Sequence, residues 1–153
     1  MTWLEHRIPP PLVTLAVAVL MWLSIYAIPQ SALPIAVRLV VGPAFAVAAG
    51  VFVLPAVRAF RRSGTTVNPV RIEKASHLVT TGMYRLTRNP MYLAMVLLLI
   101  AIAFLLGSLW CLFGPVVLML YLTRFQIQPE ERALAKIFGQ PYHDYCARVR
   151  RWL

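Results

Sequence analysis

The sequence predicts an all-helical integral membrane protein with four membrane-spanning helices. Of its 153 residues, 60% are hydrophobic and only 13% are charged, and the charged residues lie between long apolar runs. Soluble domains carry about 25% charged residues, and disordered chains are poor in apolar residues. The composition therefore excludes an ordinary soluble domain and a disordered chain. The length fits one domain over residues 1–153 and is too short for a transporter with two repeated halves.

Three stretches contain no Asp, Glu, Lys or Arg: Pro11–Ile28, Leu39–Val57 and Met91–Thr123. A spanning helix needs about 20 residues, so the first two stretches predict one span each, over residues 11–28 and 37–57. The third stretch would form about 50 Å of helix at about 1.5 Å per residue, which is too long for one crossing. We expect a helical hairpin with spans over residues 89–106 and 108–125, turning at Gly107-Ser108.

The distribution of basic residues predicts the orientation. The chain has 15 Lys and Arg residues against 5 Asp and Glu residues, a net charge of +10. Most of the basic residues lie in segment 58–90 and in the tail after residue 123, and the two short turns between spans carry none. Cytoplasmic loops collect Lys and Arg, so we expect both termini to face the cytoplasm of a prokaryotic inner or plasma membrane. Arg38 is an exception whose side chain is long enough to reach the interface.

A membrane location accounts for the positive charge without a nucleic-acid partner. The two cysteines are a separate point: Cys111 lies in an apolar run and Cys146 in the polar tail, and this placement offers no metal-ligand spacing. We therefore expect neither nucleic acid nor a metal ion.

The first polar segment of interest is the loop 71–90, which ends in Arg88-Asn89-Pro90. Asn followed by Pro is a helix-start signature, so the third span is expected to begin here with its positive dipole end toward the loop. Together with Arg85 and Arg88, the free backbone N–H groups suit a carboxylate or a phosphate. The alternative is that these arginines only orient the span and contact lipid headgroups.

The second polar segment follows the last span. Pro129 at a first helical position, Glu130 and Glu131 in the first turn, and Gly139 after the last apolar residue predict a short helix. A carboxylate pair beside a basic loop can bind a cation or take a proton from a nucleophile. The alternative is that the two acids only complement the helix dipole.

A further helix is expected to begin at Pro141, so that C-terminal helices cover residues 129–152. Tyr142, Tyr145, Val149 and Trp152 would form one stripe along it. Such a stripe with arginines nearby is typical of a helix that lies at the membrane interface.

Several motifs in these segments are shared with a known family. The first segment carries His77-Leu78-Val79, Gly82-x-Tyr84 and Arg88-Asn89-Pro90-x-Tyr92, and the second carries Glu130-Glu131, Leu134, Phe138-Gly139, Tyr142, Tyr145 and Val149. With these motifs, residues 71–153 resemble the isoprenylcysteine carboxyl methyltransferase family of integral membrane enzymes. The resemblance to phosphatidylethanolamine N-methyltransferases is more distant, and the first two spans match only in hydrophobicity.

The resemblance implies S-adenosylmethionine as the methyl donor, bound on the cytoplasmic side, and a lipophilic acceptor that enters from the bilayer. It implies a cofactor site made of His77, Leu78, Val79, Gly82, Tyr84, Arg88, Asn89, Pro90, Tyr92 and Glu130. Arg88, Glu130 and Glu131 are the expected catalytic residues, and the resemblance does not distinguish the two glutamates. Arg124 and Tyr142 are the expected acceptor-binding residues.

The acceptor suggested by the resemblance is the carboxylate of an isoprenylcysteine-like substrate, which Arg88 or Arg124 would hold. The alternative is the amine of a phospholipid, or another small amine or thiol; an amine would need Glu130 or Glu131 as a base. A rival of another class is a non-enzymatic membrane assembly or lipid-binding protein. Stabilisation by S-adenosylhomocysteine distinguishes an enzyme from this rival.

Overall fold

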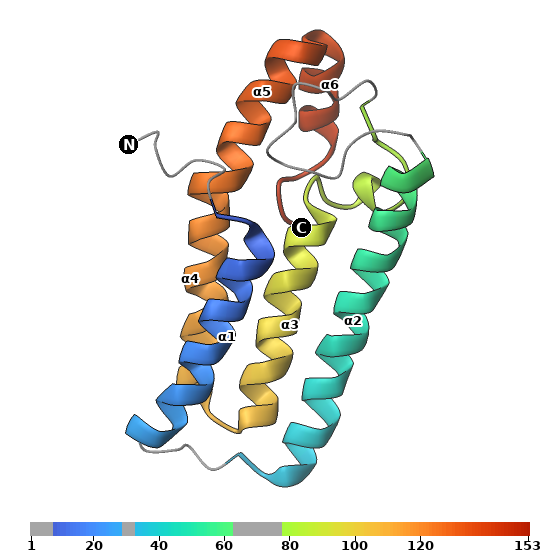
Figure 1. Ribbon diagram of the computed structural model, residues 1–153. Coiled ribbons are helices and arrows are strands. Elements are labelled where there is room, and N and C mark those ends of the chain that lie inside the picture. Colours follow the sequence, from blue (N-terminus) through green and yellow to red (C-terminus); the bar gives the residue numbers. More distant parts are fainter. Residues whose placement is uncertain (1–7, 29–32, 63–77) are drawn as a thin grey trace.

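The computed structural model describes residues 8–28, 33–62 and 78–153 (Figure 1). Over these residues the chain is helical and has no strand, as the sequence predicts. Short turns of other helix types are η2 (Gly82–Arg85) and η3 (Leu109–Leu112), both 3₁₀, and η4 (Thr123–Ile127), a π-helical turn. The α-helices are α1 (Pro10–Ala27), α2 (Ile35–Arg62), α3 (Pro90–Leu106), α4 (Phe113–Leu122), α5 (Gln128–Phe138) and α6 (Gln140–Arg148).

The apolar helices α1 to α4 lie side by side, and α5 and α6 extend beyond one end of this bundle (Figure 1). Three helical stretches are long and apolar enough to cross a membrane: Pro10–Ala27, Ile35–Ala59 and Leu109–Phe138. The remaining apolar helix, α3, has 17 residues. Within the described part of the chain, three of the four predicted spans therefore reach the length of a crossing.

The predicted turn at Gly107-Ser108 is confirmed. Helix α3 ends at Leu106, and Gly107 has a φ of 74°, in the left-handed region that glycine adopts without strain. Arg38 of α2 reaches this turn, where its Nε and Nη2 donate to the carbonyl of Leu105 at 3.1 and 2.6 Å. The last carbonyls of a helix have no partner within it, so the Arg38 side chain closes the end of α3.

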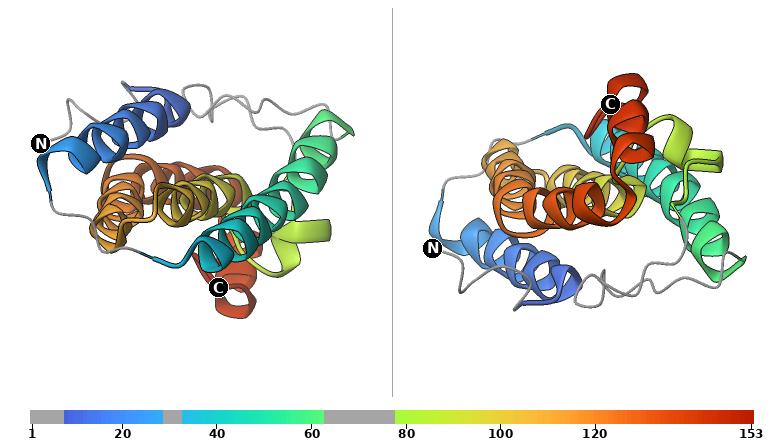
Figure 2. Two further views of the ribbon diagram at one scale, coloured as in Figure 1. Left: turned by 90° about the horizontal axis from the view of Figure 1, so that it is seen from below. Right: turned by 90° about the horizontal axis from the view of Figure 1, so that it is seen from above.

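Helix α3 lies between α1 and α2, with α4 beside it (Figure 2). Three small residues of α2, spaced seven apart, are buried against the bundle: Gly42, Ala49 and Ala56. A Cβ atom at Gly42 would lie 2.7 Å from Cγ of Leu105, closer than carbon atoms approach. Small residues let two helices pack closely, and in α2 they do so within one chain.

The fourth predicted span and the helix after it form one continuous helical stretch, contrary to the expectation of a separate start at Pro129. The π-helical turn η4 joins α4 to α5 without a break. Pro129 lacks the N–H that an α-helix would use, and the π-helical turn ends at Ile127, two residues before it, where the bonding pattern already changes. The predicted end at Gly139 is confirmed, because α5 ends at Phe138.

Helix α6 is shorter than predicted and faces the protein. It ends at Arg148 rather than at residue 152, and Val149 is extended. Tyr142 and Tyr145 are buried, and Trp152 packs against the hydrophobic core. The aromatic stripe therefore does not form a membrane-facing side, contrary to the prediction, because the same spacing suits a protein interior.

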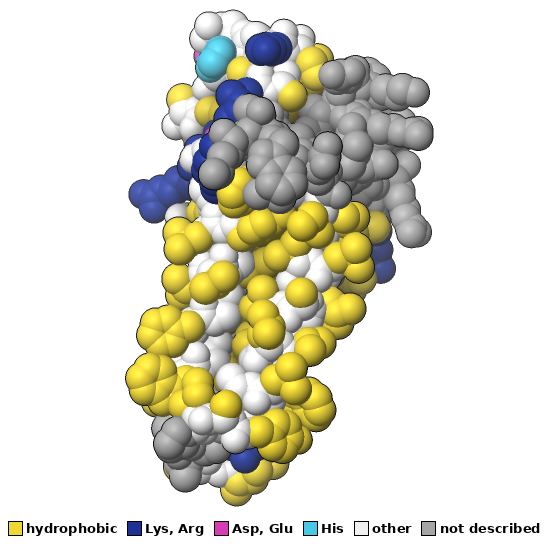
Figure 3. Space-filling view, turned by 60° about the vertical axis from the view of Figure 1, so that its left-hand side comes forward, with side chains coloured by type: hydrophobic (Ala, Val, Ile, Leu, Met, Phe, Trp, Pro, Cys, Tyr) yellow, Lys and Arg dark blue, Asp and Glu magenta, His cyan; other side chains and the backbone are white. Residues whose placement is uncertain are grey.

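The outer surface of the bundle is apolar. Hydrophobic side chains cover the visible face, whereas Lys and Arg gather toward the end that carries α5 and α6 (Figure 3). Near the ends of helices at the opposite end, Trp22, Tyr26, Trp110 and Phe113 are exposed. Soluble proteins rarely expose so large an apolar surface, and aromatic residues collect at membrane interfaces. These features identify an integral membrane protein.

Candidate functional site

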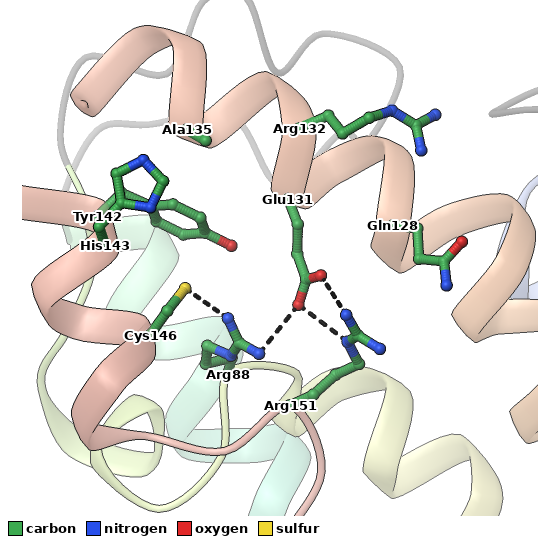
Figure 4. A pocket seen from close by; sticks show the side chains of 9 residues that line it. All are labelled: Arg88, Gln128, Glu131, Arg132, Ala135, Tyr142, His143, Cys146 and Arg151. Carbon is green, nitrogen blue, oxygen red and sulfur yellow. Dashed lines mark hydrogen bonds and ion pairs between the residues drawn. The ribbon is translucent and has the colours of Figure 1, made fainter. Parts of the chain in front are cut away.

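A pocket of about 380 Å³ lies where the start of α3, helices α5 and α6 and the C-terminal residues meet (Figure 4). Its volume is in the range of small-molecule sites, which is about 300–1,000 Å³. The residues that line it are Arg88, Gln128, Glu131, Arg132, Ala135, Tyr142, His143, Cys146 and Arg151.

Glu131 lies at the centre of the ion pairs in this pocket. Its Oε1 is 3.2 Å from Nη2 of Arg88, and it accepts hydrogen bonds from Nε and Nη2 of Arg151 at 3.0 and 2.6 Å (Figure 4). Both hydrogen bonds from Arg151 run to the carboxylate in the paired arrangement that guanidinium groups favour. The hydrogen bond to Glu131 raises the pKa of Arg151 above its ordinary value. Three separate segments of the chain therefore meet at one carboxylate.

Positive charge predominates among the described residues of the pocket. They contribute three guanidinium groups, those of Arg88, Arg132 and Arg151, and one carboxylate, that of Glu131. Arg88 also donates from Nη1 to the thiol sulfur of Cys146 on α6. A pocket with this charge suits a ligand that carries a carboxylate or another anion.

Glu130, the neighbour of Glu131, has a different environment. Its Oε1 accepts a hydrogen bond from the hydroxyl of Tyr92 on α3, and its side chain is largely shielded from solvent. Burial raises the pKa of Glu130 to about 7; the Tyr92 hydrogen bond opposes this shift and the charge of Glu131 adds to it. Among the described residues, the bonding partner of Glu130 is thus a hydroxyl and not a cation. The structure distinguishes two glutamates that the sequence could not.

The segment before α3 is attached to the C-terminal residues. The N–H of Arg88 donates to the carbonyl of Arg150 at 3.0 Å, and Thr87 Oγ1 donates to the carbonyl of Arg151 at 3.2 Å. Asn89 occupies the N-cap position as predicted, but its side chain makes no cap hydrogen bond. Its Nδ2 donates to the carbonyl of Arg151 at 2.9 Å instead. The Asn89 side chain therefore donates to a backbone carbonyl near the C-terminus, a contact that the local sequence does not predict.

The other predicted cofactor residues lie near this segment but outside the pocket lining. Leu78 and Val79 are half-buried, and Gly82 begins η2 with a φ of 63°, a conformation that favours glycine. Tyr84 is buried, and its carbonyl accepts a hydrogen bond from the hydroxyl of Tyr145 at 2.6 Å. His77, which the resemblance also implicates, lies outside the described residues.

The two predicted acceptor-binding residues are separated. Tyr142 lines the pocket and is buried. Arg124 is exposed in η4, with its guanidinium 5.4 Å from the ring centroid of Phe125, and it does not line the pocket.

Sequence reasoning missed several residues of the pocket. Arg151 and Cys146 take part in its hydrogen bonds, and Gln128, Arg132, Ala135 and His143 line it. The Arg150-Arg151 pair near the C-terminus was visible only as part of the basic tail. Nothing in the local sequence indicates that Arg151 returns to α5, because the return depends on the turn after α6.

A bundle of apolar helices that carries a polar pocket at one end is the architecture of an integral membrane protein. The family comparison then specifies its class: the chain matches the family described as phospholipid methyltransferase over residues 37–141, and it belongs to that family. This family is related to the isoprenylcysteine carboxyl methyltransferases, so the resemblance seen in the sequence is confirmed. The match includes Arg88, Glu130 and Glu131 and ends just before the pocket residues of α6.

Among curated proteins, one from Haemophilus influenzae that is described as uncharacterized is 40% identical over 63 residues. The matched residues make up 41% of this chain and 100% of that protein. Comparison with solved structures finds no match.

Proposed function

We propose that this membrane methyltransferase binds S-adenosylmethionine in the pocket around Glu131 and methylates the amine of a lipid acceptor, with Glu130 as the base. The observation that carries the proposal is the contrast between two adjacent carboxylates. Glu131 is paired with two guanidinium groups, whereas Glu130 is half-buried, accepts a hydrogen bond from the hydroxyl of Tyr92, and has its pKa raised to about 7. Acid–base roles are commonly separated by environments that differ in this way.

The residues present fit the proposed cofactor. S-adenosylmethionine carries a carboxylate, an ammonium group, a sulfonium and an adenosine. Arg132 offers a cation to the carboxylate, Glu131 offers an anion to the positively charged groups, and Tyr142 offers an aromatic ring. The bound cofactor would supply an electrophilic methyl group. Contact between the rest of the cofactor and segment 77–84, which includes Leu78, Val79, Gly82 and Tyr84, stays a prediction.

Glu130 meets the requirements of a general base. A base works best when its pKa lies near the working pH, and the pKa of Glu130 is about 7. Its carboxylate would accept the proton that an ammonium group must lose before the nitrogen can attack. The hydroxyl of Tyr92 donates to Glu130 and so orients the carboxylate. Because methyl transfer is an in-line displacement, holding the acceptor and excluding water supply much of the remaining catalysis.

The same observations favour an amine over the carboxylate acceptor that the resemblance suggested. A carboxylate acceptor needs a cation beside the reacting oxygen. Arg88 already pairs with Glu131, and Arg124 does not line the pocket. An isoprenylcysteine-like acid is therefore the comparison substrate in the assay, and a phospholipid amine is the expected one.

We further propose four crossings with both termini and the pocket on the cytoplasmic side. Helix α3, with 17 residues, is about 26 Å long at about 1.5 Å per residue, close to the apolar thickness of about 30 Å. The Gly107 turn returns the chain into α4, and basic residues gather at the pocket end (Figure 3). Reporter fusions at each terminus test this topology, and a periplasmic signal at either end contradicts it.

The function is tested with purified protein in lipid vesicles and methyl-labelled S-adenosylmethionine. We expect label in phosphatidylethanolamine, little label in a prenylcysteine acid, and at least about tenfold slower transfer by Glu130→Gln. Asp144→Asn is the matched control, because this exposed acid bonds to Gln140 on α6 and does not line the pocket. Equal rates for wild type and Glu130→Gln contradict the role of Glu130.

The same preparation tests the non-enzymatic alternative. A ligand that binds only the folded protein raises its thermal midpoint, so S-adenosylhomocysteine should stabilise the wild type and have less effect on Arg88→Ala. Absence of both stabilisation and methyl transfer in folded protein contradicts the cofactor assignment.

A further inference from the structure

Gln126 lies in the π-helical turn η4 and is completely buried. Its Nε2 donates to the backbone carbonyl of Ile8 at 3.0 Å, whereas its Oε1 is buried without a partner among the described residues. An unpaired buried oxygen costs about 1–3 kcal/mol. An apolar side chain of similar volume would therefore pack better here, and the glutamine needs an explanation other than packing.

The π-helical turn determines which way Glu130 points. Leu118 and Leu122 mark the buried face of α4. At about 3.6 residues per turn, an uninterrupted α-helix would continue this face through Pro129 and Ala133. A π-helical turn contains one extra residue, which turns the half-buried Glu130 toward α3, where the hydroxyl of Tyr92 donates to it, and Pro129 beside it is buried. Without the extra residue, Glu130 would be rotated by about 100° around the helix axis.

The contact between Gln126 and Ile8 connects this turn to the start of α1. The first helical N–H groups of α1, those of Leu12 and Val13, donate to the carbonyl of Pro9. The carbonyl of Ile8 is therefore outside the helical bonding of α1 and accepts from Gln126 instead. The hydrogen bond joins residues 118 positions apart in the sequence.

We propose that Gln126 is a positioning residue, which holds the π-helical turn through its hydrogen bond to Ile8 and thereby directs Glu130 toward Tyr92 and the reaction site. The catalytic part of this inference rests on the proposed function, whereas the direction of the Glu130 side chain does not. π-Helical turns are rare and occur frequently at functional sites.

The groups that face Glu130 come from three elements: Tyr92 of α3, Tyr84 of η2 and Glu131 of its own helix. Burial makes a larger contribution to the pKa shift of Glu130 than any of these groups does. If the helix relaxes to an α-helical turn, Glu130 rotates toward solvent and its pKa falls toward the ordinary 4.5. The pKa of Glu130 therefore reports the state of the turn without any measurement of activity.

The test is Gln126→Met, which keeps the length of the side chain and removes the donor. Tyr121→Phe is the matched control, because Tyr121 lies just before the same turn and its hydroxyl is buried without a partner among the described residues. Methyl transfer to phosphatidylethanolamine vesicles gives kcat and KM. Infrared titration of protein with ¹³C-labelled glutamate gives the pKa of the Glu130 carboxyl, and Glu130→Gln identifies its band.

For Gln126→Met we expect kcat to fall at least about tenfold, with the KM for S-adenosylmethionine within about twofold of wild type. The carboxyl midpoint should move from about 7 toward 4.5, and the thermal midpoint should stay or rise. Tyr121→Phe should match the wild type in all of these. A wild-type carboxyl midpoint in Gln126→Met overturns the proposal, whether or not kcat falls. If the wild type transfers no methyl group, the proposed function fails, and the shift of the midpoint alone supports or overturns the positioning role.

Discussion

Replacing Glu131 by Gln tests the ion-pair network that joins three segments at the pocket. The change keeps the shape of the side chain and removes its charge. The carboxylate pairs with Arg88 at 3.2 Å and with Arg151 at 2.6 Å. The side chains of Arg88 and Glu131 are 15% and 18% exposed, and that of Arg151 is 36% exposed.

These exposed fractions place the network between fully exposed and fully buried ion pairs, whose contributions to stability differ. Exposed ion pairs contribute about 0–1 kcal/mol, whereas removing one partner of a buried pair costs about 3–5 kcal/mol. We expect Glu131→Gln to lower the free energy of unfolding by about 2 kcal/mol, because solvent screens part of the interaction. For a chain of this size, such a loss lowers the thermal midpoint by about 4–8 °C.

Tryptophan fluorescence during thermal unfolding in detergent measures this loss, and Trp152 lies next to Arg151 and packs against the core. Glu131→Gln, Arg151→Met and the double variant form a cycle that isolates the pair from other effects of each substitution. We expect a coupling energy of about 1 kcal/mol. A midpoint within about 1 °C of wild type for Glu131→Gln, or strictly additive losses in the cycle, would contradict a stabilising role for these ion pairs.

Three further predictions concern packing, hydrogen bonding and pH. Gly42→Ile should lower the free energy of unfolding by about 1–3 kcal/mol, because its Cβ meets α3, whereas Gly50→Ile, where a Cβ has no atom within 4 Å, should be near neutral in the same thermal assay. Tyr145→Phe should cost about 1–2 kcal/mol on thermal unfolding, because it removes the 2.6 Å hydrogen bond to the buried Tyr84 segment, and an unchanged midpoint contradicts this. The pKa of Glu130 is higher in the folded protein than its ordinary 4.5, so the folded state holds a proton that the unfolded state releases, and stability should fall as pH rises from 4.5 to about 7. Methyl transfer should rise over the approach to pH 7 as the carboxylate forms, and Glu130→Gln should remove both slopes.

Much of the fold was predictable because a membrane restricts it. The apolar runs and the basic loops indicated helices with bounds close to those of α1 and α3, and Gly107 marked the turn between α3 and α4. Regular apolar helices satisfy their own backbone groups, so length and composition are sufficient to recognise them.

The candidate site was predictable in part. The motifs indicated Arg88, Glu130, Glu131 and Tyr142, and the structure brings Arg88, Glu131 and Tyr142 to one pocket. The role of Asn89 was predicted as a helix cap, but its side chain donates to a backbone carbonyl near the C-terminus. A local pattern identifies the residues that begin a helix, and it carries no information on a partner 62 positions away.

Hydropathy and the order of residues were therefore sufficient to predict the membrane class, the helical composition and the segments that carry polar chemistry, because these depend on neighbours along the chain. The difference between the two glutamates depends on how the chain folds in three dimensions. The π-helical turn rotates Glu130 toward Tyr92, and the return of the C-terminal residues places Arg151 beside Glu131. Adjacent residues with the same side chain acquire different chemistry because burial and charged partners depend on the helices packed around them, not on the order of residues.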